Sequence, residues 1–117
     1  MEKRNIIKEK SFDFAIDIVN LYKELIEKKE FVMSKQLLKS GTSIGANVRE
    51  AEFAQSKADF IHKMSISLKE ANETDYWLEL LFKTNFISKI TFKKFKSKST
   101  EILKILITIV KSSKTNY

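Results

Sequence analysis

Apolar residues recur along this chain every three to four positions, which is the spacing of a helix with one buried face. Three stretches show this period clearly, at about residues 11–28, 56–83 and 88–111. Each therefore predicts one amphipathic helix. Their apolar stripes are, in order, Phe14, Ile18, Tyr22 and Leu25; Phe60, Met64, Leu68, Ala71, Leu78 and Phe82; and Phe92, Phe95, Ile102, Leu103, Leu106, Ile109 and Val110.

A fourth apolar stretch begins near Ser34 and is ambiguous. Leu37, Ile44 and Ala51 recur at heptad spacing, as on one face of a helix. Between them, residues 40–47 have poor helix propensity and contain both glycines of the chain. The pattern fits either two shorter helices or one continuous helix whose small residues let a neighbouring backbone come unusually close.

Two polar residues of this stretch, Asn47 and Glu50, lie in or beside its apolar register. A buried amide or carboxylate must find a partner, because leaving it unpaired costs about 1–3 kcal/mol. We expect a polar network that fixes the helix register, with a ligand pocket as the alternative.

Few residues of this chain favour turns, which argues against a β-rich fold. There is no proline and there are only two glycines, whereas a β-rich domain needs many turns that use both. Long helices joined by short links must run antiparallel to their neighbours. The sequence therefore predicts an all-α fold, an antiparallel up-down-up-down four-helix bundle, as a single domain over residues 1–117.

No stretch of the sequence resembles a membrane or export signal. The most apolar run, residues 102–110, is interrupted by Lys104 and is too short to span a bilayer. The first 14 residues have no apolar core of signal-peptide length. We expect a cytoplasmic protein with no membrane partner.

The residues that carry most enzyme chemistry are scarce. There is no cysteine, and His62 is the single histidine, whereas a di-iron bundle site needs two Glu-x-x-His pairs. The sequence contains neither a G-x-S-x-G nucleophile motif nor a phosphate-binding P-loop. We therefore expect no enzymatic activity, no catalytic residue, no metal and no cofactor.

Positive charge is concentrated in the last third of the chain. Residues 1–82 hold 13 Lys and Arg against 14 Asp and Glu, while residues 83–117 hold nine Lys against Glu101 alone. Such a basic segment is typical of a protein that binds RNA or DNA through phosphates. The alternative is a solvated face in a lysine-rich chain, which the ratio of 20 Lys to two Arg favours. The candidate nucleic-acid-binding residues are Lys89, Lys93, Lys94, Lys96, Lys98 and Lys104.

Apolar residues are numerous enough to fill one core and leave some over. Aromatic side chains are the usual anchors of protein interfaces. We therefore expect self-association, and possible recruitment of a protein partner, through Phe31, Phe53, Tyr76 and Trp77.

The run from Ser43 to Ala51, S-I-G-A-N-V-R-E-A, resembles the four-helix-bundle family of 23S rRNA intervening-sequence proteins, whose typical run is S-I-P-A-N-I-A-E-G. Gln36-Leu37 and Ser67-Leu68-Lys69-Glu70-Ala71 add to the likeness, which covers about residues 12–110. Gly45, Arg49 and Ala51 depart from the family pattern. The matching motif positions are Ser43, Ile44, Ala46, Asn47, Val48 and Glu50.

The resemblance implies properties that the spacing of residues does not show. It implies a continuous second helix and assembly as a homopentamer. A related group comprises the accessory proteins of diversity-generating retroelements, in which a basic pentamer holds nucleic acid and reverse transcriptase. We therefore expect a non-enzymatic homo-oligomer that binds nucleic acid through a basic surface. The alternative is a structural or protein-interaction scaffold with no nucleic-acid role.

Overall fold

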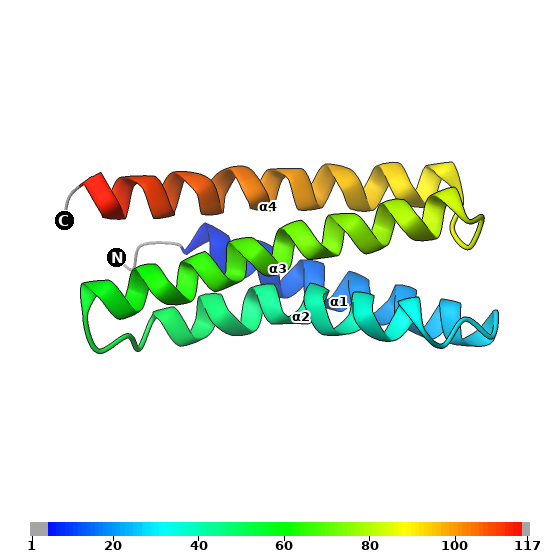
Figure 1. Cartoon of the computed structure of the whole chain (residues 1–117), viewed down its shortest axis with the longest axis horizontal. Helices are drawn as coiled ribbons and strands as arrows, with labels where there is room; N and C mark the ends of the chain where they lie inside the picture. Colours follow the sequence, from blue (N-terminus) through cyan, green and yellow to red (C-terminus); the bar gives the residue numbers. More distant parts are fainter. Residues whose placement is uncertain (1–4, 116–117) are drawn as a thin grey trace.

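The computed structural model describes residues 5–115, which form four long helices (Figure 1). They are α1 (Ile6–Glu27), α2 (Met33–Ala51), α3 (Lys57–Lys83) and α4 (Lys89–Thr115). Each helix packs antiparallel beside the next, and α4 returns to lie beside α1, with which it makes the least extensive contact of the four pairs. The predicted all-α, up-down-up-down four-helix bundle is confirmed, with dimensions of 46 × 27 × 20 Å.

Local hydrogen bonds decide where the helices begin. Helix α3 is capped by Ser56, whose hydroxyl accepts from the backbone N–H of Asp59 at 3.0 Å. The Asp59 carboxylate accepts in turn from the backbone N–H of Gln55 at 3.2 Å. The start of α1 was predicted too late, since the Asn5 side chain accepts from the backbone N–H of Lys8 and caps the helix at Ile6.

The start of α2 depends on a buried carboxylate that the sequence pattern did not reveal. Glu30 accepts hydrogen bonds from three successive backbone N–H groups, those of Val32, Met33 and Ser34, at 3.0, 3.0 and 2.8 Å. These N–H groups have no partner within the helix, and a negative charge is favourable at a helix N-terminus. Glu30 thereby supplies the cap that Val32, the residue before the helix, does not.

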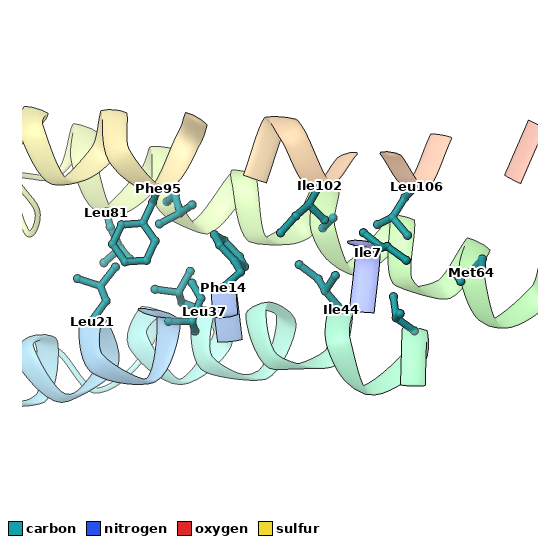
Figure 2. Packing of buried hydrophobic residues seen from close by; sticks show 14 of the residues in the cluster. Ile7, Phe14, Leu21, Leu37, Ile44, Met64, Leu81, Phe95, Ile102 and Leu106 are labelled. Atoms are coloured by element: carbon teal, nitrogen blue, oxygen red, sulfur yellow. The ribbon is translucent and has the colours of Figure 1, made fainter. Parts of the chain in front are cut away.

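The helices share one apolar core, part of which Figure 2 shows. Phe14 meets Phe95 edge-on, with ring centroids 6.1 Å apart, and so joins α1 to α4 across the core. Phe14, Ile18 and Leu25 of the predicted α1 stripe are buried, whereas Tyr22 is only partly buried and its place in the core is taken by Leu21. Small hydroxyl residues are buried among the apolar side chains and are hydrogen-bonded. They are Ser11, Ser34, Ser40, Ser67, Thr74 and Ser99.

The helix α2 is continuous through both glycines, as the resemblance implied. A Cβ atom added at Gly41 would lie 2.8 Å from both Cγ atoms of Ile18, which is fully buried in α1. A Cβ atom at Gly45 would lie 3.2 Å from the backbone oxygen of Ser11. Both glycines therefore serve close contact between α1 and α2, and neither forms a turn.

This contact predicts that Gly41→Ala destabilises the protein by about 1 kcal/mol. Overpacking a filled core costs about 1–3 kcal/mol, and the better helix propensity of alanine returns about 1 kcal/mol. Urea unfolding followed by circular dichroism measures the change, with Asn72→Ala on the exposed face of α3 as the control. A Gly41→Ala variant more stable than the wild type would contradict the prediction.

Candidate binding surfaces

The family-motif residues occupy several sides of α2. Ile44 and Val48 are fully buried in the core, whereas Ala46 is exposed. The Ser67 hydroxyl of α3 donates to the backbone oxygen of Ile44 at 2.8 Å and so aligns the two helices at the motif. The Asn47 side chain donates to the backbone oxygen of Ser43 at 2.9 Å, one turn earlier in its own helix. Asn47 thus bonds within its own helix, and the hydrogen bond between α2 and α3 at the motif is made by Ser67.

Glu50 is placed differently from the expectation that it lies in the apolar register. Val48 and Ala51 point into the core, and Glu50 between them points outward, with 61% of its side chain exposed. Its carboxylate lies 3.8 Å from the Nζ atom of Lys63, a loose ion pair. The interpretation of Glu50 as a buried network residue is therefore wrong.

The candidate lysines lie along α4, at the top of Figure 1. Two of them hold α4 to its neighbours, since Lys96 pairs with Asp75 of α3 at 3.1 Å and Lys98 with Asp17 of α1 at 2.6 Å. The other four are exposed and form no ion pair within residues 5–115. They are Lys89, Lys93, Lys94 and Lys104.

Three of these four lysines form a line on the outer face of α4. At 100° per residue, Lys89, Lys93 and Lys104 fall within about 60° of one another and span about 22 Å of helix. A shallow hollow of about 480 Å³ lies along this face, bordered by Lys93, Lys96 and Lys104. Glu101, the single acid of α4, also borders the hollow and forms an ion pair with Lys10 of α1. We call Lys89, Lys93 and Lys104 the lysine line.

The four candidate interface aromatics do not form one patch. Phe31 precedes α2 and Phe53 follows it, so the two exposed rings lie at opposite ends of that helix. Tyr76 is exposed on α3, while Trp77 is partly buried against the core and donates to the Glu73 carboxylate at 3.2 Å.

Two exposed apolar residues of α1 were missed by the sequence analysis. Phe12 and Ile16 are half-exposed and lie one turn apart. Their four-residue spacing on the polar side of the Phe14–Ile18 stripe was the available signal.

Two further features of the described residues bear on function. Within residues 5–115, no three His, Cys, Asp or Glu side chains come together in a way that could hold a metal ion. In the same range, no helix is both long and apolar enough to cross a membrane.

The sequence model of the 23S rRNA-intervening sequence proteins matches residues 3–108. The chain belongs to the 23S rRNA-intervening sequence protein family. A crystal structure of a family relative, described as a protein of unknown function from the S23 ribosomal protein family of Bacteroides thetaiotaomicron, superposes with a TM-score of 0.89. That protein is 63% identical, and the match covers 90% of this chain and 98% of the relative. No curated protein matches the sequence.

In this intervening-sequence protein, one carboxylate beside the motif helix has a shifted pKa. Partial burial raises the pKa of Glu70 above its ordinary value of 4.5, and the nearby charge of Glu73 raises it further. Lys39 of α2 and Lys69 act in the opposite direction. At neutral pH the ionised Glu70 side chain therefore opposes folding slightly.

This shift predicts that Glu70→Gln is more stable than the wild type at pH 7. A carboxyl with a raised pKa in the folded state costs stability above that pKa, and the cost disappears as the pH falls through the folded pKa to below 4.5. The advantage of the variant should therefore shrink toward pH 4. Urea unfolding at pH 7 and pH 4 measures it, with Glu79→Gln on the exposed face of α3 as the control. An advantage that grows on acidification would contradict the assignment.

Proposed function

We propose that this protein is a non-enzymatic, cytoplasmic homo-oligomer, a pentamer, that binds RNA or DNA through the basic face of α4. The observation that carries the proposal is the lysine line, three exposed lysines with no acidic partner in residues 5–115. A row of unneutralised positive charges on a straight helix favours a polyanion.

The chemistry of this face favours contact with phosphates over reading of bases. Lysine binds phosphate as a point charge, whereas base recognition relies largely on the bidentate fork of arginine. Helix α4 itself contains no arginine. Lys94, Lys96 and Lys98 flank the line, and Lys96 and Lys98 would join the contact by exchanging their carboxylate partners for phosphates. Binding is therefore expected to depend on salt and to be nearly independent of sequence.

Self-assembly would place several copies of the lysine line in one particle. One copy offers only a few phosphate contacts, but several lysine lines held in one ring bind a long strand with a high effective concentration. The kinship with the retroelement accessory proteins, proposed from the motif resemblance, points in the same direction.

The second candidate function is a scaffold that recruits a protein and has no nucleic-acid role. Exposed Phe31, Phe53 and Tyr76 favour it, since aromatic side chains are enriched in protein interfaces. A measurement of nucleic-acid binding distinguishes the two functions, because only the first requires it.

We expect Lys89→Gln, Lys93→Gln and Lys104→Gln, combined in one protein, to weaken binding of a nucleic-acid duplex. The slope of log affinity against log salt is negative, and each lost phosphate contact reduces its magnitude by about 0.9, so the variant's slope should be shallower by about 3 per bound copy. Titrations between about 50 and 200 mM salt, read by fluorescence anisotropy, measure it.

The control removes the same charge elsewhere, by Lys23→Gln, Lys35→Gln and Lys69→Gln on the exposed faces of α1, α2 and α3. Equal loss in the two triple variants would mean that only net charge matters. If the wild-type protein formed no complex with the duplex at micromolar concentration and about 50 mM salt, the nucleic-acid proposal would be contradicted and the scaffold function favoured.

A further inference from the structure

An aromatic ring lies at the edge of the hollow on α4. Phe92, near the start of α4, borders this hollow together with Lys93, Lys96 and Lys104. On the helix surface Phe92 is also a neighbour of Lys89, one turn earlier, because residues three and four apart lie side by side. The ring is therefore placed among the lysines to which the proposed function assigns the phosphates.

The Phe92 ring is held in place by stacking on a second ring. Its centroid lies 4.6 Å from that of Phe82 in α3, and the angle between the two ring planes is 6°. Both side chains are partly buried and pack against the apolar core. One face of the Phe92 ring is thus covered, so a ligand in the hollow can meet this ring only on the side away from Phe82.

A fixed ring beside a row of cations matches the two parts of an unpaired nucleotide. Proteins that bind single strands combine positive charges along the backbone with aromatic rings on which bases stack. Every base has a π-face, so stacking adds affinity without reading the sequence. In a duplex the bases are stacked on one another and must leave the helix before a protein can cover their faces. The ring therefore favours an unpaired base over a base pair.

The rest of the hollow is polar and suits a sugar and a phosphate. Ser97 and Thr100 border it, and their hydroxyl groups can donate or accept hydrogen bonds. Glu101 borders it as well, but its ion pair with Lys10 of α1 reduces its repulsion of a phosphate. The volume of about 480 Å³ is within the range of small-molecule sites, about 300–1,000 Å³. A base with its sugar therefore has room in the hollow.

We propose that the hollow on α4 binds an unpaired base of a single-stranded nucleic acid, stacked on Phe92, while the lysine line contacts the neighbouring phosphates. This inference rests on the proposed function and adds the form of nucleic acid that the site recognises. The lysines attract any polyanion, whereas Phe92 distinguishes an unpaired strand from a duplex.

The variant Phe92→Leu tests the inference, because leucine keeps an apolar side chain and removes the ring. Fluorescence anisotropy measures the affinity for a thymidine oligonucleotide of about 12 nucleotides and for its duplex. We expect the affinity for the single strand to fall about fivefold or more, the typical loss of one stacked base, and the affinity for the duplex to stay the same. Stacking releases no counterions, so the salt dependence of single-strand binding should not change.

Two further variants are the controls, and circular dichroism checks the fold of all three. Phe92→Tyr keeps the ring and should bind the single strand with nearly the wild-type affinity. Phe53→Leu removes a ring that is 80% exposed in the connection between α2 and α3, at the opposite end of α3 from Phe92. It should change neither affinity.

Two results with Phe92→Leu would overturn the inference while the proposed function stands. One is an unchanged affinity for the single strand, and the other is an equal loss of affinity for the single strand and the duplex. A wild-type protein that binds neither form would remove both the proposed function and this inference.

A second measurement uses the chain without substitution. An iodouracil base placed in the oligonucleotide cross-links under ultraviolet light to an aromatic ring on which it is stacked. We expect the cross-linked peptide, identified by mass spectrometry, to contain Phe92. Cross-links confined to other aromatic residues would overturn the inference even if Phe92→Leu failed to fold.

Discussion

The close contact between α1 and α2 is the constraint on which the arrangement of the bundle depends. Gly41 and Gly45 allow it, because a side chain at either position would meet Ile18 or the backbone of Ser11. The contact brings the apolar stripes of the first two helices together and leaves α3 and α4 to complete the core from the other side. Glu30 supports it by holding the first turn of α2 in place.

The same arrangement accounts for the placement of α4. Its contact with α1 is the least extensive of the four, and charged pairs bridge this side of the bundle, Lys98 to Asp17 and Lys10 to Glu101. Such partly exposed pairs add little stability, on the order of 0–1 kcal/mol each. They also decide which charges of α4 remain unpaired. Glu101, the single acid of α4, is paired with Lys10 of α1, so the lysine line on the outer face has no acidic partner within residues 5–115.

Much of the fold could be predicted from the sequence because it depends on local pattern. The 3.6-residue period predicted three of the helices, whereas the continuity of α2 was implied only by the family resemblance. The predicted start of the third stretch near residue 56 agrees with the structure, where Ser56 caps α3 through a partner three residues away. The features that were missed depend on neighbours distant in sequence or on loop geometry. Glu30 was missed although its partners are only two to four residues away, because glutamate is not among the usual N-cap residues. Nothing local shows that Lys96 and Lys98 meet carboxylates on other helices. Glu50 was misplaced although the predicted stripe of Leu37, Ile44 and Ala51 is buried, because Glu50 lies next to that stripe and its side chain points outward.

The candidate surfaces also differ in how much of each could be predicted from the sequence. The basic character of α4 was evident from lysine count alone, but its split into paired and unpaired lysines required the bundle. The groove between α1 and α2 is bordered by residues more than 30 positions apart in sequence, Phe12 and Ala46 among them, and the packing at Gly45 brings them together. For this reason Phe53 could be singled out from the sequence but its neighbours in space could not.

The proposed contact of this intervening-sequence protein with nucleic acid lies on the outer face of α4. Acetylation of lysine amines with and without a nucleic-acid duplex, read by mass spectrometry, tests it across all 20 lysines of the chain in one experiment. We expect protection at Lys89, Lys93 and Lys104 and unchanged reactivity at Lys23, Lys35 and Lys69. Protection spread evenly over the lysines, or confined to α1 and α2, would contradict it.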